Sequence, residues 1–234
     1  RGLPDADAIE YELRGETEHP GFLEFRALVK LPSQGEAVPI LSFFPKQQWN
    51  KQAVLWLSGN GKADLVSASG TPRPNVLALL DAGAAVLGAD LLYQGEFLAD
   101  GKPLQQARMV KGRPYAAYTF GYNSPLFAQR VHDILTLVRF ARSHSYSPDR
   151  VHLVGLDGAG PWVAAAGAQA GDAVDGVALD TQGFRFAALT AYEDVNFLPG
   201  AVKYGDLPGL LSLCAPSDLW IAGEAGKIPE IVTK

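Results

Sequence analysis

Residues 152–162 read HLVGLDGAGPW, a run that leads from an apolar strand through a glycine-rich turn into an apolar helix. The predicted strand is Arg150–Gly155, and the predicted helix begins at Pro161 and continues to Ala170 with apolar side chains nearly all round. A helix that is apolar on every side packs centrally, so we expect this strand, turn and helix at the centre of the fold.

Short β-rich runs alternate with helical stretches on both sides of this unit. Continuous apolarity predicts strands buried on both faces at 53–57, 84–89, 150–155, 176–179 and 218–222. Residues 22–30 and 38–45 alternate around a turn and predict an antiparallel hairpin. Helices are expected at 75–82, from Ser124 as N-cap with Pro125 at the first helical position, and from Pro229. The alternation predicts an α/β fold over residues 1–234, with a mostly parallel central sheet covered by helices on both faces.

Composition excludes several classes of partner and cofactor. The net charge is −5, which gives no support for nucleic-acid binding. One cysteine, Cys214, excludes an intramolecular disulfide and a cysteine-rich zinc module, and the four histidines lack metal-ligand spacing. No apolar run approaches the roughly 20 residues that span a bilayer. We therefore expect no metal, no cofactor and no membrane span.

The ends of the sequence suggest a processed chain. It opens Arg1-Gly2-Leu3-Pro4 without methionine, and it stops inside the helix predicted from Pro229. We expect a trimmed piece with a truncated C-terminus, whose compartment stays open and would be secreted or periplasmic if a signal peptide has been removed.

The turn has the small residues of a nucleophile elbow. In the pattern G-x-S-x-G, small residues flank the nucleophile because the strained turn brings strand and helix close together. Here Gly155 and Ala159 flank Asp157, so an aspartate stands where the serine belongs. An aspartate can itself act as a nucleophile. A close strand–helix crossing that merely needs small residues is the simpler alternative.

A dinucleotide fingerprint is a further alternative for the same turn. Gly155, Gly158 and Gly160 lie between strand and helix, and Asp180 ends the next strand, where a ribose-binding acid belongs. The middle glycine of G-x-G-x-x-G would be Asp157, whose carboxylate would repel the pyrophosphate. We therefore expect no binding of NAD or FAD.

Other polar and aromatic residues favour structural roles. Asp90 ends a buried strand and is expected to cap its loop, Lys62 to be solvated, and His132 to lie on a helix surface. The aromatic residues within 115–122 are expected to fix a long loop to the core.

The order of these motifs resembles the α/β-hydrolase superfamily, and most of all its bacterial acetylxylan-esterase-like and dienelactone-hydrolase-like members. The motifs are LSGNGK at 57–62, ADLLYQGE at 89–96 and HLVGLDGAGPW at 152–162. The resemblance implies a carboxylic-ester hydrolase that acts on an acylated carbohydrate or another small ester. It assigns oxyanion-hole amides to the loop Gly59-Asn60-Gly61 and to Gly158, and the catalytic acid to Asp180 or Glu224.

The sequence departs from this family at two points. Asp157 replaces the serine, and the family's histidine follows an eighth strand, which we do not expect before the sequence ends at Lys234. The family that the chain resembles also contains two-domain proteins whose second hydrolase-like half has a degenerate elbow. If this chain is such a half, its partner would be a second hydrolase-like domain in the same protein. Three functions stay open: an ester hydrolase, a non-catalytic domain with a binding or structural role, and a hydrolase with an aspartate nucleophile.

Overall fold

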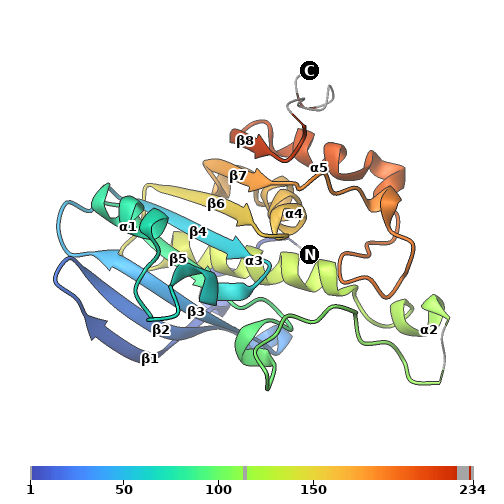
Figure 1. Ribbon diagram of the computed structural model, residues 1–234, viewed down its shortest axis with the longest axis horizontal. Coiled ribbons are helices and arrows are strands. Elements are labelled where there is room, and N and C mark those ends of the chain that lie inside the picture. The colour runs from blue at the N-terminus through green and yellow to red at the C-terminus, as the bar shows by residue number, and fades with distance from the viewer. Residues whose placement is uncertain (1, 113–114, 226–231, 233–234) are drawn as a thin grey trace.

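The computed structural model describes residues 2–112, 115–225 and 232. In this part of the chain, eight strands form one sheet in the order β1-β2-β3-β5-β4-β6-β7-β8 (Figure 1). The strands are β1 (Glu10–Glu18), β2 (Phe22–Leu31), β3 (Glu36–Pro45), β4 (Gln52–Ser58), β5 (Ala85–Ala89), β6 (Arg150–Leu156), β7 (Gly176–Asp180) and β8 (Asp218–Ala222).

The predicted parallel sheet is confirmed, with β6 in its interior. Strands β5, β4, β6, β7 and β8 pair in parallel, and β6 lies between β4 and β7. The hairpin is confirmed as β2 and β3, but the antiparallel part also contains β1, which pairs with β2. Strand β1 was not predicted because its sequence, EYELRGETE, is largely polar and exposed, so it lacks an apolar alternation.

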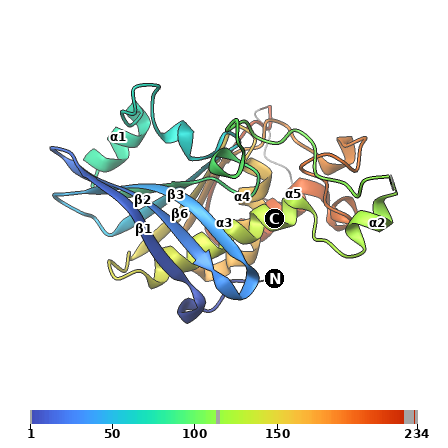
Figure 2. The same ribbon diagram turned by 90° about the horizontal axis from the view of Figure 1, so that it is seen from below.

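The helices are α1 (Pro74–Asp81), α2 (Ala116–Phe120), α3 (Leu126–Ser143), α4 (Gly160–Ala170) and α5 (Asp206–Cys214). Helix α1 covers one face of the sheet and α3 the other (Figure 2). None of the helices in the described ranges is long and apolar enough to cross a membrane.

One predicted helix begins at a different residue, and helices α2 and α5 were not predicted. Helix α3 begins one residue later than expected, because Pro125 has extended backbone angles (φ −55°, ψ 149°) and takes the N-cap position instead of Ser124. Helix α5 was not predicted, since Pro208 and Gly209 interrupt its pattern. The helix expected from Pro229 lies outside the described residues.

Apolar side chains fill both faces of the sheet. The larger cluster lies between the sheet and helices α3, α4 and α5, and includes Leu55, Leu153 and Val163, all fully buried. A smaller cluster around Phe43 and Leu65 packs beneath α1. The core therefore fixes both layers of helices against one sheet.

The parallel strands end together at one edge. Ser58 at the end of β4 is paired with Leu156 at the end of β6, and Asp180 at the end of β7 with Ala222 at the end of β8. The loops that follow these strands therefore gather at the edge where α/β sheets bind ligands. We call this the carboxyl edge of the sheet.

Candidate functional site

The turn between β6 and α4 has the backbone of a nucleophile elbow. Asp157 has φ 50° and Gly158 has φ 92°, and only four residues separate the end of β6 at Leu156 from Pro161 in the first turn of α4. A non-glycine residue with positive φ is uncommon, and such strained positions cluster at functional sites. The carboxylate of Asp157 is exposed and makes no hydrogen bond within the described ranges. The turn therefore presents this side chain to solvent at the carboxyl edge.

Close backbone contacts explain the small residues around the elbow. A Cβ on Gly160 would lie 2.1 Å from the carbonyl oxygen of Asp180, and a Cβ on Gly59 would lie 1.9 Å from that of Asp157. A Cβ on Gly155 would meet Val163 at 2.8 Å. The turns after β4, β6 and β7 are thus in direct contact.

The loop expected to supply oxyanion-hole amides lies beside the elbow, but two of its amides are already occupied. The amide of Gly59 donates to the carbonyl of Leu156 at 3.3 Å, and the amide of Asn60 donates to Ser58 Oγ at 3.1 Å. The amide of Gly158 has no acceptor in the residues that the structure describes. Of the four predicted oxyanion amides, those of Gly61 and Gly158 are therefore the two without an acceptor in the described residues.

A buried ion pair holds the same loop. Asp90 is 1% exposed and accepts hydrogen bonds from the amides of Lys62 and Glu96, both at 3.0 Å. The ammonium of Lys62 forms an ion pair with Asp90 and a second with Glu96 at 2.6 Å. The capping role predicted for Asp90 is confirmed. The prediction that Lys62 is solvated was wrong: its ammonium supplies the counter-charge that the buried carboxylate of Asp90 needs.

Sequence reasoning missed Gln94, which joins the loops after β4 and β5. Its side chain is fully buried, and Nε2 donates to the carbonyl oxygens of Ser58 at 3.1 Å and Gly59 at 2.8 Å. Its Oε1 accepts from the amide of Leu91 at 3.0 Å. A glutamine in a loop gives no sequence signal for such a role, because its partners are backbone groups far along the chain.

The two candidate acids occupy the carboxyl edge in different environments. Asp180 Oδ1 accepts from the amide of Gln182 at 2.9 Å and so caps its own turn. Glu224 binds Arg185 through both oxygens, at 3.0 Å and 2.5 Å, and accepts from Thr181 Oγ1 at 2.6 Å. Hydrogen bonding from Arg185 lowers the pKa of Glu224, so its carboxylate stays ionised.

The four histidines of the chain lie away from the turns at the carboxyl edge. The surface position expected for His132 was wrong: it is 6% exposed, and its Nδ1 lies 2.8 Å from Glu36 Oε1. His152 lies near the start of β6, opposite Gly176 at the start of β7. His19 and His144 follow β1 and α3, and neither belongs to a turn that follows a parallel strand.

Helix α3 supports the site with two buried ionisable side chains, Arg130 and Asp133. Arg130 is 1% exposed, donates from Nε to the carbonyl of Leu92 at 3.0 Å, and lies 4.4 Å from the ring of Trp162. Asp133 accepts from the amide of Leu92 at 2.8 Å. Burial lowers the pKa of Arg130 to about 10 and raises the pKa of Asp133 to about 7. Both side chains bind the backbone of Leu92 in the loop after β5, and Arg130 also contacts Trp162 in helix α4.

Exposed tyrosines lie on the long loop before α3. Tyr115, Tyr118 and Tyr122 are 69%, 45% and 93% exposed, so the expectation that they fix the loop to the core was wrong for these three. Phe120 does pack, against Phe197 at 5.3 Å. Figure 1 shows α2, which carries part of this group, on the side toward which the parallel strands point.

Metal ligands do not gather here: within the described residues, no group of three or more His, Cys, Asp or Glu side chains could hold a metal ion.

The sheet order, with three antiparallel strands leading into a parallel sheet and a tight turn after the interior strand β6, matches known esterase structures. The chain has the α/β-hydrolase fold. It is similar to a glucuronoyl esterase from Solibacter usitatus, with a TM-score of 0.59 and 13% identity over 91% of this chain and 67% of that one. It is also similar to acetyl xylan esterase 1 from Thermoanaerobacterium sp., with a TM-score of 0.61 and 14% identity over 92% of this chain and 74% of that one.

A third similar structure is a cold-adapted esterase from an Arctic intertidal metagenomic library, with a TM-score of 0.55 and 14% identity over 90% of this chain and 76% of that one. No protein-family model matches the sequence, and no curated protein does either. The similarity is therefore one of fold, with esterases as its structural neighbours.

Proposed function

We propose that this hydrolase-fold chain binds an acylated carbohydrate at the carboxyl edge and does not hydrolyse it through an acyl-enzyme. The observation that carries the proposal is Asp157, which stands at the apex of the elbow with φ 50° and its carboxylate in solvent. The elbow geometry is the one that aims a nucleophile at a substrate, so a ligand in this position would meet the carboxylate first.

Electrostatics oppose acyl transfer at this position. Acyl transfer develops an oxyanion, which preorganised amides must stabilise in a dry site. The carboxylate of Asp157 adds a negative charge beside the Gly158 amide, and the amides of Gly59 and Asn60 already donate elsewhere. A carboxylate suits sugar hydroxyls better, since these donate charge-assisted hydrogen bonds.

Two observations support a carbohydrate ligand. The structural neighbours include a glucuronoyl esterase and an acetyl xylan esterase. The exposed rings of Tyr115, Tyr118 and Tyr122 offer apolar faces with polar hydroxyl groups, a combination that suits stacking against a sugar ring.

Titration calorimetry with an acetylated xylo-oligosaccharide tests this proposal. We expect saturable binding that Asp157→Asn weakens about tenfold or more, because the substitution removes a charged hydrogen-bond acceptor. Asp172→Asn, which changes an exposed carboxylate in the 3-10 turn after α4, is the matched control and should bind like the unmodified chain. The absence of binding, or equal weakening by both substitutions, would overturn the proposal.

A hydrolase with an aspartate nucleophile is the second candidate, and the unengaged carboxylate of Asp157 favours it. The carboxylate would attack the ester carbonyl and release the alcohol, which takes a proton from water, to leave a mixed anhydride that water hydrolyses to two acids. Repeated turnover in ¹⁸O-labelled water with peptide mass spectrometry is the test. Label in the Asp157 carboxylate would establish this candidate and overturn the first.

A further inference from the structure

The long loop between β5 and α3 carries a charge opposite to that of the chain as a whole. Its residues 101–123, which we call the basic loop, contain four of the 20 basic residues and none of the 25 acidic residues. The four are Lys102, Arg108, Lys111 and Arg113. Since the net charge of the chain is −5, this loop forms a local excess of positive charge. Such an excess raises the local concentration of anionic ligands.

Arg108 is held in place without an acidic partner. Its guanidinium lies 4.5 Å from the centroid of the Tyr93 ring, whose electron-rich face attracts a cation. Among the described residues, no carboxylate forms an ion pair with Arg108, Lys102 or Lys111. Arg108 is exposed, so its N–H donors are open to a ligand from solvent.

Tyr93 connects this cation with the carboxyl edge. It has φ 61°, an uncommon backbone angle for a tyrosine, and its carbonyl accepts from the amide of Leu104 at 3.3 Å. The next residue is Gln94, whose side chain donates to the carbonyl of Gly59 at 2.8 Å, in the turn that contacts the elbow. Arg108 is therefore stacked on the loop that borders the elbow.

A second segment of the carboxyl edge holds the middle of the basic loop. The amide of Ala107 donates to the carbonyl of Glu193 at 2.7 Å, and Gln106 forms a β-bridge with Asp194. The carboxylate of Asp194 accepts from the amide of Asn196 at 2.8 Å and so caps its own turn. These contacts are to the backbone of the basic loop, so they fix its position without neutralising its cations.

The side chains around these cations suit a sugar better than a lipid surface or a nucleic acid. The exposed rings of Tyr115, Tyr118 and Tyr122 belong to the same loop and offer faces to a sugar ring. A loop that enters a membrane carries large apolar side chains, whereas Val110 is only 38% exposed and Phe120 packs inward. A nucleic acid would meet a chain whose net charge is negative.

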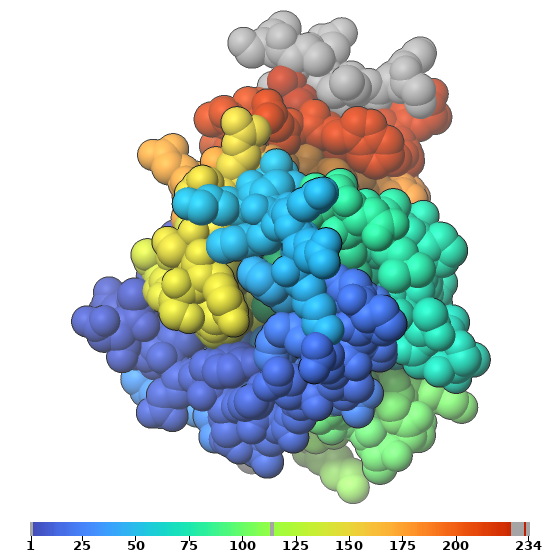
Figure 3. Space-filling view, turned by 90° about the vertical axis from the view of Figure 1, so that its left-hand side faces the viewer, coloured from blue at the N-terminus to red at the C-terminus, as the bar shows by residue number. Residues whose placement is uncertain are grey.

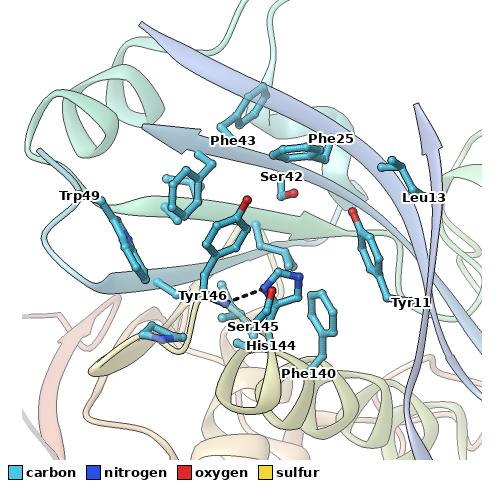
Figure 4. Close-up of a pocket in the computed structure, with 18 residues that line it drawn as sticks. Tyr11, Leu13, Phe25, Ser42, Phe43, Trp49, Phe140, His144, Ser145 and Tyr146 are labelled. Carbon is cyan, nitrogen blue, oxygen red and sulfur yellow. Dashed lines mark hydrogen bonds between the residues drawn. The ribbon is translucent and has the colours of Figure 1, made fainter. Parts of the chain in front are cut away.

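A cavity elsewhere in the molecule has no charge to offer an anion. Its volume is about 320 Å³, and its lining includes Ala53 and Ala85, at the starts of β4 and β5 and thus at the opposite end of the strands from the elbow. Figure 3 views this end and shows a hollow between the segment after α3 and the N-terminal strands, and Figure 4 shows its aromatic lining. The described residues that line it include no Lys, Arg, Asp or Glu. An anionic sugar would lose its hydration there without a counter-charge.

We propose that the basic loop binds a uronic acid residue of the carbohydrate ligand, with the guanidinium of Arg108 on its carboxylate. The inference rests on the proposed function, because it names the class of carbohydrate that reaches the carboxyl edge. A guanidinium matches a carboxylate through two parallel N–H···O bonds. The uronic acid would lie at the basic loop, and a neighbouring sugar would present its hydroxyls to Asp157.

Titration calorimetry with two forms of one oligosaccharide tests this inference. The first is an acetylated xylo-oligosaccharide with one glucuronic acid side group, and the second has that carboxylate converted to an uncharged primary amide. We expect the acid to bind about tenfold more tightly than the amide, the effect of one charge-assisted hydrogen-bonded pair, and this preference should shrink as salt is added.

Substitution of Arg108 shows whether the preference arises at the basic loop. Arg108→Gln should abolish the preference for the acid and leave the affinity for the amide unchanged. Arg150→Gln removes an exposed cation at the start of β6, at the far end of the strands, so it is the matched control and should keep the preference. Circular dichroism verifies that both variants fold.

The ring beneath the guanidinium gives a second test. Tyr93→Leu removes the aromatic face and should reduce the preference for the acid about threefold, whereas Tyr93→Phe keeps the face and should retain it. Equal affinity for acid and amide, or a preference that survives Arg108→Gln, would overturn the inference. If Asp157→Asn still weakened the binding of both forms, the proposed function would stand without it.

The remaining outcomes separate the two proposals further. A preference that is lost in Arg108→Gln, with binding indifferent to Asp157→Asn, would support the inference and overturn the proposed function. Binding of neither form would overturn both. Tighter binding to phosphatidylserine vesicles or to duplex DNA than to the acid would overturn the inference, since the basic loop would then recognise phosphate.

Discussion

Gln94 should contribute more to the free energy of unfolding than a loop residue usually does. We consider Gln94→Met, which keeps the length of the side chain but removes its amide. The substitution leaves the buried amide of Leu91 without its acceptor, and the carbonyls of Ser58 and Gly59 without a donor. Leu91 and Ser58 are buried, whereas Gly59 is half-buried and its carbonyl can be rehydrated.

An unsatisfied buried backbone group costs about 1–3 kcal/mol, so two such groups predict a loss of about 2–6 kcal/mol in the free energy of unfolding. Urea denaturation followed by circular dichroism measures this loss at pH 7. Gln105→Met is the matched control, because Gln105 is exposed and bonds only to the nearby carbonyl of Pro103, so it should change stability by less than about 0.5 kcal/mol. A Gln94→Met loss no larger than that of the control would refute the reasoning.

Three further substitutions test the packing and charges of the site by urea denaturation. Gly160→Ala puts a Cβ 2.1 Å from the last carbonyl oxygen of β7 and should cost about 2 kcal/mol or more, whereas Gly15→Ala, whose Cβ meets nothing within 4 Å, should cost far less. Asp133 has its pKa raised from 3.8 to about 7 by burial, so its protonated form favours the folded state; this contribution is present below pH 4 and is lost as the pH rises to about 7. Asp133→Asn should remove that part of the pH dependence, and an unchanged profile would contradict the assignment. Glu224→Gln breaks the ion pair with Arg185 and should lower the free energy of unfolding by about 1 kcal/mol at pH 7. Because the pair lowers the pKa of Glu224, this loss should shrink as the pH falls below 4. A loss that stays constant with pH would count against the ion pair.

The sequence predicted the parallel core well because its strands carry a strong local signal. Apolar runs such as AVLWL in β4 are buried on both faces, so their pattern follows directly from their place in the sheet. Strand β1 gave no such signal, since it is held by backbone pairing with β2 and keeps exposed polar side chains. Helix α5 was hidden by Pro208 and Gly209, although packing against α4 stabilises it.

The site was predictable where it depends on local backbone and unpredictable where it depends on distant partners. The tight turn at Asp157 could be located because small residues must flank it. The environments of Lys62 and His132 could not, because Asp90 and Glu36 reach them only through the tertiary fold. For these two side chains, burial depends on a counter-group that lies far along the chain.

Steady-state hydrolysis of 4-nitrophenyl acetate tests the central claim most directly, because it asks whether the elbow with Asp157 transfers an acyl group. The account predicts that the unmodified chain and Asp157→Asn release 4-nitrophenol at the same rate, no faster than the heat-denatured protein. Asp157→Ser should also stay inactive, since no histidine lies on a carboxyl-edge turn in the described part of the chain. Robust hydrolysis by the unmodified chain that disappears in Asp157→Asn would contradict the account and identify the aspartate as the nucleophile.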